Sequence, residues 1–301
     1  MQSLLTGILT TLIILANTLV CLVPILLFSL LKLLIPIAWF REACFEMVRL
    51  IAAAWISFNL LIFRYLIPTD WDIRGQQHLS KKESLLIISN HQSWVDIPAL
   101  MVAVHGKTPF FMFFLKRELI WVPLLGLAWW ALEYPFMRRY SKAQLEKNPQ
   151  LQGQDLAITR KACNHLKGRS VSLVNYLEGT RFTQAKHQLQ KSPYQHLLKP
   201  KSGGVAFTLS AMQKQLHYYL DITVVYPENS PPNFWKLLSG QVKSVIVDIQ
   251  KKPIPETMKQ GNYQEDLVFR EAFQTWINQL WYEKDQRIEQ LQQALEVKTK
   301  A

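Results

Sequence analysis

Cysteine is scarce in this sequence of 301 residues. The chain has three, Cys21, Cys44 and Cys163, which are widely spaced and form no Cys-x-x-Cys pair. Their odd number and spacing argue against a disulfide framework, and no cysteine–histidine spacing suits a zinc site. We therefore expect small buried thiols in a reducing compartment and no bound metal. Six histidines outside the motif described below also lack metal-ligand spacing: His78, His105, His165, His187, His196 and His217.

Charge is absent from the N-terminal end of the chain, where Lys32 is the first charged residue. An uncharged apolar run of this length exceeds the roughly 20 residues that cross a bilayer as a helix. A cleaved signal peptide is the competing explanation, but no basic segment precedes the run and no clear small-residue cleavage site follows it. We therefore predict a membrane anchor over residues 1–67, built from one apolar helix or from a helical hairpin.

The second arm of such a hairpin would be residues 47–67, which are apolar but interrupted by Arg49, Asn59 and Arg64. These polar residues leave three topologies open: one crossing, two crossings, or a hairpin in one leaflet. Basic residues follow the first run, and an excess of Lys and Arg marks the cytoplasmic side of a membrane. We therefore expect the main domain on the cytoplasmic face.

The formal net charge of +12 suits anionic partners, including nucleic acid, anionic lipids and phosphorylated substrates. No segment resembles a helix-turn-helix, an RNA-recognition motif or a zinc finger, so we expect no nucleic acid partner.

Strands and helices alternate over residues 68–262, which predicts an α/β catalytic domain with a covered sheet. Predicted buried strands cover residues 83–89, 110–115, 170–177, 221–226 and 244–249, and predicted helices cover 154–166 and 204–212. Residues 119–132 are predicted to form a buried or membrane-facing helix. Residues 263–301 are predicted to form one long or two short amphipathic helices and a tail.

A histidine and an aspartate five residues apart follow the first of these strands, in Asn90-His91-Gln-Ser-Trp-Val-Asp96. On one continuous helix the two side chains would lie about 140° apart. They can converge with His91 in a strand-to-helix turn and Asp96 in the first helical turn, where Pro98 favours a helix start. Such a pair supplies a general base and a carboxylate that orients it. The alternative is a helix-capping Asp96 beside a turn histidine without catalytic function.

The segment Asn90–Asp96 resembles the first signature of the lysophosphatidic acid acyltransferases, the 1-acylglycerol-3-phosphate O-acyltransferase family. Three further signatures of that family follow in the family's order. Lys116–Leu119 leads into the second, Pro135–Arg139, and the others resemble Leu177–Phe182 and Val224–Pro227. Four ordered signatures over about half of the chain make a specific match. The resemblance implies a glycerolipid acyltransferase-like sheet flanked by helices, after an N-terminal membrane helix or hairpin.

The sequence departs from the family pattern at two positions near the second signature. Glu133 stands where many members have glycine, and Met137 replaces the usual isoleucine. Both positions lie near the acceptor pocket that the resemblance implies. The resemblance points to a bacterial membrane enzyme, while the run from Glu178 with Lys186 and His187 is closest to a branch shared with eukaryotic relatives.

The resemblance implies an acyl-CoA or acyl-carrier protein as co-substrate, with no other cofactor. A thioester is already activated, so the enzyme needs a base, His91 oriented by Asp96, and no covalent nucleophile. The absence of a Gly-x-Ser-x-Gly elbow agrees with this.

The acceptor that the resemblance implies carries a phosphate, which requires cations. By resemblance, Lys116 and Arg181 are its ligands, with Arg138 and Arg139 as further candidates. The alternative is that all four are solvated surface cations.

The turn around Arg181 contributes the remaining predicted site residues. Gly179 permits close backbone approach, and it stands with Thr180 among the substrate-binding residues. Glu178 either anchors the loop or binds an acceptor hydroxyl. Asn90 is predicted to support the turn beside the histidine.

The expected function is transfer of a fatty acyl group to the free hydroxyl of lysophosphatidic acid, giving phosphatidic acid at the bacterial cytoplasmic membrane. Membrane lipids, the lysophospholipid acceptor and the acyl donor are the expected partners. Two alternatives stay open: the same chemistry on another lysophospholipid or lipid acceptor, and a non-catalytic basic membrane-anchored binding protein.

Overall fold

The protein is described from a computed structural model, which covers residues 2–137, 148, 163, 166, 168–227 and 231–300. The chain divides into two compact units. The helical unit comprises Met1–Thr69, Met112–Arg139 and Trp235–Lys243, and the sheet unit comprises Asp70–Phe111, Tyr140–Phe234 and Ser244–Ala301. Each unit is described separately. The domain boundaries predicted from the sequence stay a prediction.

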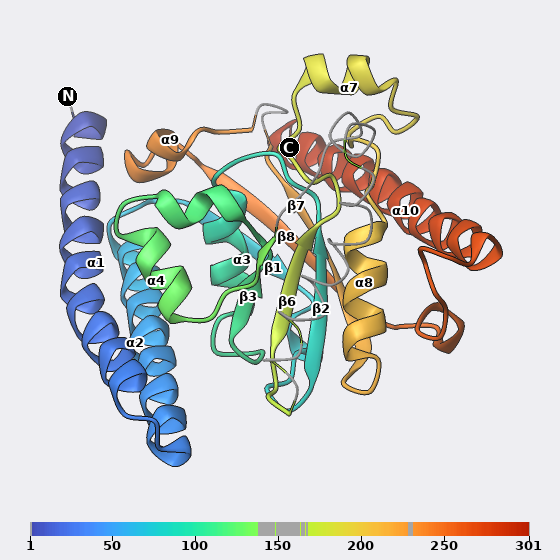
Figure 1. Cartoon of the computed structure of the whole chain (residues 1–301). Coiled ribbons are helices and arrows are strands. Elements are labelled where there is room, and N and C mark those ends of the chain that lie inside the picture. The colour runs from blue at the N-terminus through green and yellow to red at the C-terminus, as the bar shows by residue number, and fades with distance from the viewer. Residues whose placement is uncertain are drawn as a thin grey trace. The chain divides into compact units, whose positions relative to one another are not determined.

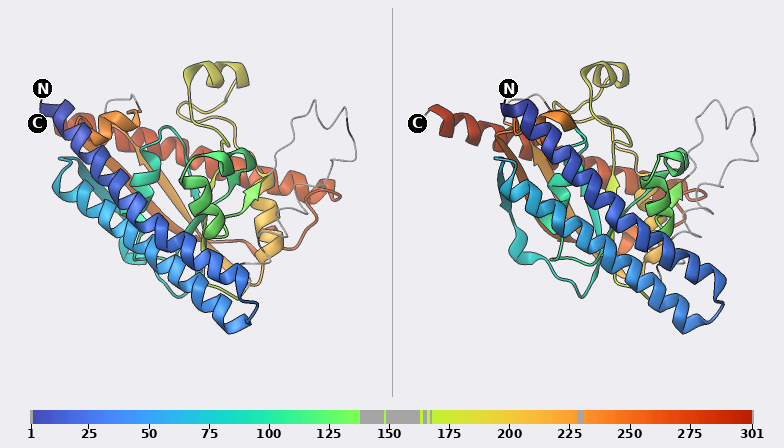
Figure 2. Two further views of the ribbon diagram at one scale, coloured as in Figure 1. Left: turned by 60° about the vertical axis from the view of Figure 1, so that its left-hand side comes forward. Right: turned by 90° about the vertical axis from the view of Figure 1, so that its left-hand side faces the viewer.

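Two long helices dominate the helical unit, α1 (Gln2–Leu34) and α2 (Ala38–Tyr65). They lie side by side as a hairpin, and both are long and apolar enough to cross a membrane (Figure 2). The few polar side chains near the middle of the hairpin contact one another across the helix pair. Asn17 Nδ2 donates to Asn59 Oδ1 at 3.0 Å, and Trp55 Nε1 donates to Thr18 Oγ1 at 3.0 Å. Such bonds satisfy polar groups that apolar surroundings would otherwise penalise.

The predicted single helix over residues 119–132 is wrong, because the structure breaks it in two. A 3₁₀ helix, η2, spans Arg117–Trp121 and α4 spans Leu125–Ala131. Pro123 lies between them, and Leu124 has a φ of 65°, a conformation that ends regular helix. Two short strands, β4 (Leu115–Lys116) and β5 (Phe136–Met137), pair in parallel on either side of this segment.

Both ends of α1 are fixed within the helical unit. Near the first end, Thr10 Oγ1 donates to Leu238 O at 2.6 Å, at the end of α9 (Phe234–Leu238). Near the other end, Lys32 forms an ion pair with Glu133. Glu133 itself has a φ of 57°, in the left-handed region that favours glycine. A glycine, the residue expected here from the family resemblance, would adopt this conformation without steric strain.

A six-stranded sheet in the order β1-β8-β7-β2-β6-β3 forms the centre of the sheet unit (Figure 1). The pairs β1–β8, β2–β7 and β2–β6 are parallel, and β7–β8 is antiparallel. The central strands are nearly continuous apolar runs, as expected for strands covered on both faces. The strands are β1 (Asp70–Arg74), β2 (Ser84–Ser89), β3 (Phe111–Phe113), β6 (Ser172–Tyr176), β7 (Leu216–Val225) and β8 (Ser244–Pro253).

Helices cover both faces of this sheet (Figure 1). Helix α3 (Asp96–Val104) lies on one face, and α8 (Gly203–Met212) and α10 (Leu267–Lys300) lie on the other. Alternate side chains of β7 mark the α10 face: the ring of Tyr219 meets the edge of Trp276, and Thr223 accepts from Lys284. The predicted C-terminal amphipathic region is thus one helix.

One lysine of α10 is completely buried against the sheet. Lys284 forms an ion pair with Asp221 and donates to Ile222 O at 2.7 Å. Burial lowers the pKa of Lys284, and the Asp221 carboxylate opposes that shift. A buried charge of this kind is tolerated only when it is paired and hydrogen-bonded.

Other sequence expectations differ from the structure in detail. The strand predicted over residues 110–115 is divided into β3 and β4, and β7 and β8 are longer than predicted. Strand β1 was missed, because its sequence Asp-Trp-Asp-Ile-Arg is polar, which suits an edge strand. The helix predicted over residues 154–166 lies almost entirely outside the described residues.

Candidate active site

Three parallel strands bring three of the four sequence signatures to one edge of the sheet. Strands β6, β2 and β7 are neighbours that run in the same direction. The segments that follow their carboxyl ends are 177–182, 90–96 and 226–227. In α/β sheets ligands gather at this edge, since the loops that leave neighbouring parallel strands meet there.

His91 and Asp96 converge in the turn between β2 and α3. The distance from His91 Nδ1 to Asp96 Oδ2 is 2.8 Å. Asp96 is the first residue of α3, and the turn that precedes it folds the histidine back onto the carboxylate. The His91 side chain is 16 % exposed, whereas Asp96 is fully buried. The ring of Tyr176 stacks on the imidazole with centroids 4.1 Å apart and the planes 16° from parallel.

Asp96 is held by protein donors on both of its oxygens. Oδ2 also accepts from the backbone N–H groups of Gln92 at 2.6 Å and Ser93 at 2.9 Å. Oδ1 accepts from the hydroxyl of Tyr226 at 2.5 Å. Burial and the neighbouring carboxylate raise the pKa of Tyr226 well above its ordinary value, so its hydroxyl remains a donor. The carboxylate can therefore fix the orientation of the imidazole.

Tyr226 was not among the predicted site residues, although it lies in the fourth signature. The signal that could have found it is a hydroxyl-bearing ring directly after an apolar strand, at the edge where the other signatures end.

Asn90 extends the sheet beyond the end of β2. Its side-chain amide donates to Val224 O and accepts from Val224 N, both at 2.9 Å. The amide thus takes the place of a backbone partner for β7, and it fixes the first residue of the turn that holds His91.

Glu178 is completely buried, and both oxygens of its carboxyl group contact backbone N–H groups. Oε1 accepts from His91 N at 2.8 Å and Oε2 accepts from Leu198 N at 3.2 Å. Burial raises the pKa of Glu178 to about 8. These contacts are those of a loop anchor, one of the two roles that the sequence left open.

The loop after Glu178 returns to the same turn. Gly179 has a φ of 67°, and Phe182 N donates to His91 O at 2.7 Å. Lys186 Nζ closes this loop by donating to Thr180 Oγ1 at 2.8 Å and to Arg181 O at 3.0 Å. Lys186 is not among the site residues predicted from the sequence, and its position in α7 (Gln184–Gln190) lets it bridge the two ends of the loop.

Arg181 lies over an aromatic ring from the histidine turn. Its guanidinium carbon is 4.5 Å from the centroid of the Trp94 ring. In the described part of the chain no carboxylate forms an ion pair with Arg181. The cation is therefore free to pair with an anionic ligand.

The remaining predicted phosphate ligands fall outside the described part of the sheet unit. Lys116 is exposed at the end of β4 in the helical unit. Arg138 and Arg139 lie outside the described residues. The structure thus brings together His91, Asp96, Asn90, Glu178, Gly179, Thr180 and Arg181.

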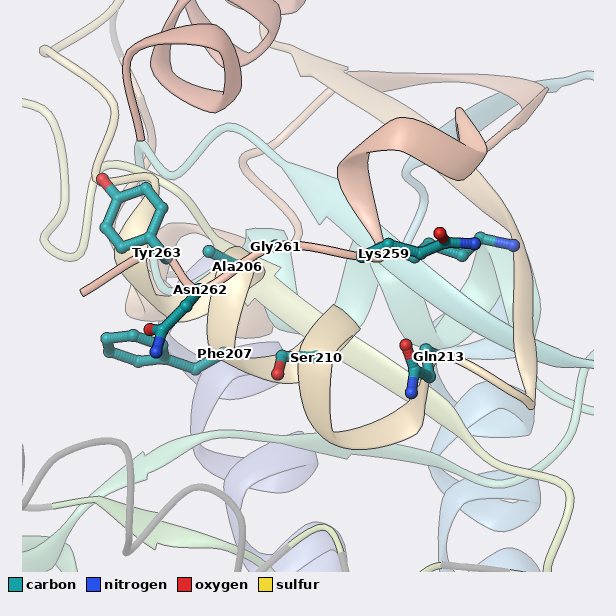
Figure 3. Close-up of a pocket in the computed structure, with 9 residues that line it drawn as sticks. Ala206, Phe207, Ser210, Gln213, Lys259, Gly261, Asn262 and Tyr263 are labelled. Atoms are coloured by element: carbon teal, nitrogen blue, oxygen red, sulfur yellow. The ribbon is translucent and has the colours of Figure 1, made fainter. Parts of the chain in front are cut away.

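A cavity of about 240 Å³ lies elsewhere in the sheet unit, between α8 and residues 259–263 (Figure 3). Its lining includes Phe207, Ser210, Gln213, Lys259 and Tyr263, and it contains none of the predicted site residues. Across the residues that the structure covers, no three His, Cys, Asp or Glu side chains cluster in a way that could hold a metal ion.

The sheet order and the paired histidine and aspartate define an α/β domain with a candidate general base at the carboxyl ends of its parallel strands. The profile of the Acyltransferase family matches residues 70–227, so the chain belongs to the Acyltransferase family. The family predicted from the four signatures is thereby confirmed, while its bacterial branch stays a prediction.

Curated relatives include the 1-acyl-sn-glycerol-3-phosphate acyltransferases delta and gamma of Mus musculus. The delta relative is 26 % identical over 219 residues, which cover 68 % of this chain and 52 % of the relative. The gamma relative is 25 % identical over 215 residues, with the same two coverages. The chain thus spans about half the length of the curated relatives that it matches.

The fold is similar to the crystal structure of the 1-acyl-sn-glycerophosphate (LPA) acyltransferase PlsC from Thermotoga maritima. The TM-score is 0.51 at 17 % sequence identity, and the match covers 93 % of this chain and 98 % of that one. This similarity confirms the predicted fold class.

Proposed function

We propose that this protein transfers a fatty acyl group from acyl-CoA or acyl-carrier protein to the free hydroxyl of lysophosphatidic acid, which gives phosphatidic acid. The observation that carries the proposal is the 2.8 Å contact between His91 Nδ1 and Asp96 Oδ2, beyond the carboxyl end of β2, where its parallel neighbours also end. This contact leaves Nε2 of the imidazole as the nitrogen that can take a proton.

The reaction needs one base and no covalent enzyme intermediate. His91 Nε2 removes the proton of the acceptor hydroxyl while the hydroxyl oxygen attacks the thioester carbonyl carbon. The Asp96 carboxylate stabilises the imidazolium that forms. The tetrahedral intermediate then collapses: the carbon–sulfur bond breaks, the ester forms, and the proton passes from the imidazolium to the departing thiolate. General base catalysis of this kind typically contributes about 10²–10⁴-fold to the rate.

Arg181 is the proposed ligand of the acceptor phosphate within the sheet unit. A guanidinium can hold a phosphate through two parallel hydrogen bonds, and Arg181 has no carboxylate partner among the described residues. Its loop is tied to the histidine turn through Glu178 and Phe182, so a phosphate bound there would sit at the catalytic edge. Lys116, Arg138 and Arg139 stay candidates for further phosphate contacts.

The relatives support lysophosphatidic acid as the acceptor, because their names describe acyl transfer to 1-acyl-sn-glycerol-3-phosphate. Another phosphorylated lysolipid is the second candidate, since Glu133 and Met137 depart from the family pattern near the second signature.

The α1–α2 hairpin is the proposed membrane-binding element. It exposes large apolar side chains such as Leu5, Leu12, Val20 and Val23. Among the three topologies left open, we favour a hairpin in one leaflet, because α1 is fixed near both ends: Thr10 contacts α9, and Lys32 pairs with Glu133. A helix that crossed the bilayer would carry these contacts to opposite membrane surfaces. Placement at the bacterial cytoplasmic membrane, facing the cytoplasm, is part of this proposal.

Acyl transfer is tested with the full chain purified in detergent, labelled acyl-CoA or acyl-carrier protein, and a panel of lysolipids. We expect His91→Ala to abolish transfer and Arg181→Ala to weaken the use of phosphorylated acceptors selectively. His217→Ala and Lys214→Ala are matched controls, because both residues are exposed in the sheet unit away from the catalytic turn. Full activity of His91→Ala would refute the mechanism, and equal losses of Arg181→Ala on phosphorylated and neutral acceptors would refute the phosphate assignment.

The topology is tested by labelling with a membrane-impermeant maleimide after the three native cysteines are replaced by alanine. A cysteine at Pro36, between the helices, should react from the same side of the membrane as a reference cysteine at Leu189 in the sheet unit. Reaction from the opposite side would contradict the one-leaflet hairpin.

A further inference from the structure

Trp94 is an exposed aromatic residue in the turn that carries His91 and Asp96. It lies between His91 and Asp96, yet its side chain is 50 % exposed, while both neighbours Ser93 and Val95 are buried. The backbone around it is rigid, because Ser93 N donates to Asp96 and Val95 N donates to Ser93 Oγ at 3.0 Å. The indole is therefore presented to solvent from a fixed support, and burial in the core does not explain its position.

The face of the Trp94 indole contacts Arg181, the residue that we propose as the ligand of the acceptor phosphate. Arg181 lies 4.5 Å above the ring, within the range of a cation–π interaction. Lys186 holds the backbone of the same residue, because its Nζ donates to the Arg181 carbonyl oxygen at 3.0 Å. The backbone and the guanidinium of Arg181 are thus supported separately.

An aromatic ring has a different effect on an arginine than a carboxylate has. Arg74 and Arg287 donate their N–H groups to Asp72 and Asp248, which occupies the donors and neutralises the charge. A ring orients the guanidinium plane but leaves its N–H donors and its positive charge available. Such an arrangement suits an arginine whose guanidinium is oriented before a dianionic phosphate binds.

We propose that Trp94 is a positioning residue for the acceptor: its indole holds the Arg181 guanidinium in the orientation that receives the phosphate, and it links the phosphate site to the turn that carries His91. This inference rests on the proposed function, because it assumes an acceptor whose phosphate binds Arg181. It adds a specificity-determining position within the first signature, between the catalytic residues.

The expected effect follows from the strength of such contacts. A cation–π pair at an exposed site contributes about 0.5–1 kcal/mol, and about 2 kcal/mol when ligand binding removes water. These values correspond to a rise in KM for lysophosphatidic acid of roughly 2- to 30-fold in Trp94→Leu. We expect kcat to stay within about twofold, since the indole forms neither a hydrogen bond nor a ring contact with His91 or Asp96 in the described structure. Trp94→Phe should restore most of the affinity, because it keeps a π face.

The experiment compares Trp94→Leu, Trp94→Phe, Arg181→Ala and the double variant Trp94→Leu/Arg181→Ala, with Leu189→Ala as an exposed control in the same unit. If the proposal is correct, Trp94→Leu raises KM in the native background and has no further effect when Arg181 is absent. It should also leave KM for a neutral monoacylglycerol unchanged. Wild-type KM in Trp94→Leu, or the same KM increase in both backgrounds, would overturn the proposal.

Binding without turnover separates this proposal from the proposed function. The dissociation constant of lysophosphatidic acid is measured by calorimetry on His91→Ala and on His91→Ala/Trp94→Leu, after thermal unfolding confirms that both are folded. Weaker binding in the second variant supports the role of Trp94 even if the wild-type protein shows no acyl transfer. Equal binding by the two variants, or no detectable binding to either, would overturn it.

Discussion

Replacement of Tyr226 by phenylalanine removes a single oxygen atom from the support of the His91–Asp96 pair. The Tyr226 side chain is buried, with the residue 3 % exposed, and its hydroxyl donates to Asp96 Oδ1 at 2.5 Å. The other three bonds of the carboxylate, to His91, Gln92 and Ser93, all fall on Oδ2. In the described structure, Tyr226→Phe therefore leaves Oδ1 buried without a donor, while the ring still fills its space.

The magnitude follows from the charge of the acceptor. A hydrogen bond to a charged group contributes about 1.5–3 kcal/mol, so the free energy of unfolding should fall by about that amount. The unfolding midpoint should fall by roughly 3–12 °C, from a dependence of about 2–4 °C per kcal/mol for domains somewhat smaller than this chain. The His91–Asp96 bond remains but loses one of its supports. We expect kcat to fall by about 3- to 10-fold, a change of roughly 0.7–1.4 kcal/mol in the activation barrier, with KM unchanged.

The assay combines thermal unfolding in detergent with steady-state acyl transfer to lysophosphatidic acid. Tyr282→Phe is the matched control, because Tyr282 is exposed on α10 and should change neither quantity. Native stability and native kcat in Tyr226→Phe would refute the reasoning. So would a complete loss of activity equal to that of His91→Ala, because the carboxylate would then depend on this one bond.

Further predictions concern buried and strained charges. Lys284→Met leaves the buried Asp221 with Lys252, 3.6 Å away, as its remaining ion-pair partner in the described structure. We therefore expect a loss of about 3 kcal/mol in unfolding free energy, the lower end of the cost of removing one partner of a buried ion pair, largely recovered in Lys284→Met/Asp221→Asn; thermal or chemical unfolding checks both. Because burial raises the pKa of Glu178 from 4.5 to about 8, the folded protein keeps a proton that the unfolded chain releases, and this group's contribution to stability falls as pH rises from about 4.5 to about 8. As the pH rises across that window, the unfolding midpoint of the wild type should fall relative to that of Glu178→Gln. A difference between the two midpoints that does not change with pH would contradict the raised pKa of Glu178. Glu133→Ala should destabilise the protein more than Glu133→Gly does. Both variants lose the ion pair with Lys32, but only alanine retains the strain of the positive φ. Equal thermal unfolding midpoints for the two variants would contradict the strain.

Local pattern in the sequence was sufficient for the fold class. Apolar runs such as residues 84–89 and 172–176 predict buried strands, because burial on both faces demands continuous apolar sequence. The uncharged N-terminal run predicts the long apolar helices, and the strand-to-helix turn predicts that His91 and Asp96 can meet. Sequence pattern failed where local signals were weak or misleading: the polar edge strand β1, and the break at Leu124, which apolar composition conceals.

By itself, the sequence determined that this chain is an α/β acyltransferase-like protein with an apolar N-terminal region and a histidine–aspartate pair. Only the tertiary structure decided which groups support that pair. Tyr226 reaches Asp96 across 130 positions and Glu178 reaches the His91 amide across 87, because β7 and β6 flank β2 in the sheet. The order of the strands in the sheet brings these partners together, and that order cannot be deduced from the spacing of the residues along the sequence. The same applies to Arg181 over Trp94, since a cation and a ring far apart in sequence become neighbours only after the parallel strands that carry them are adjacent.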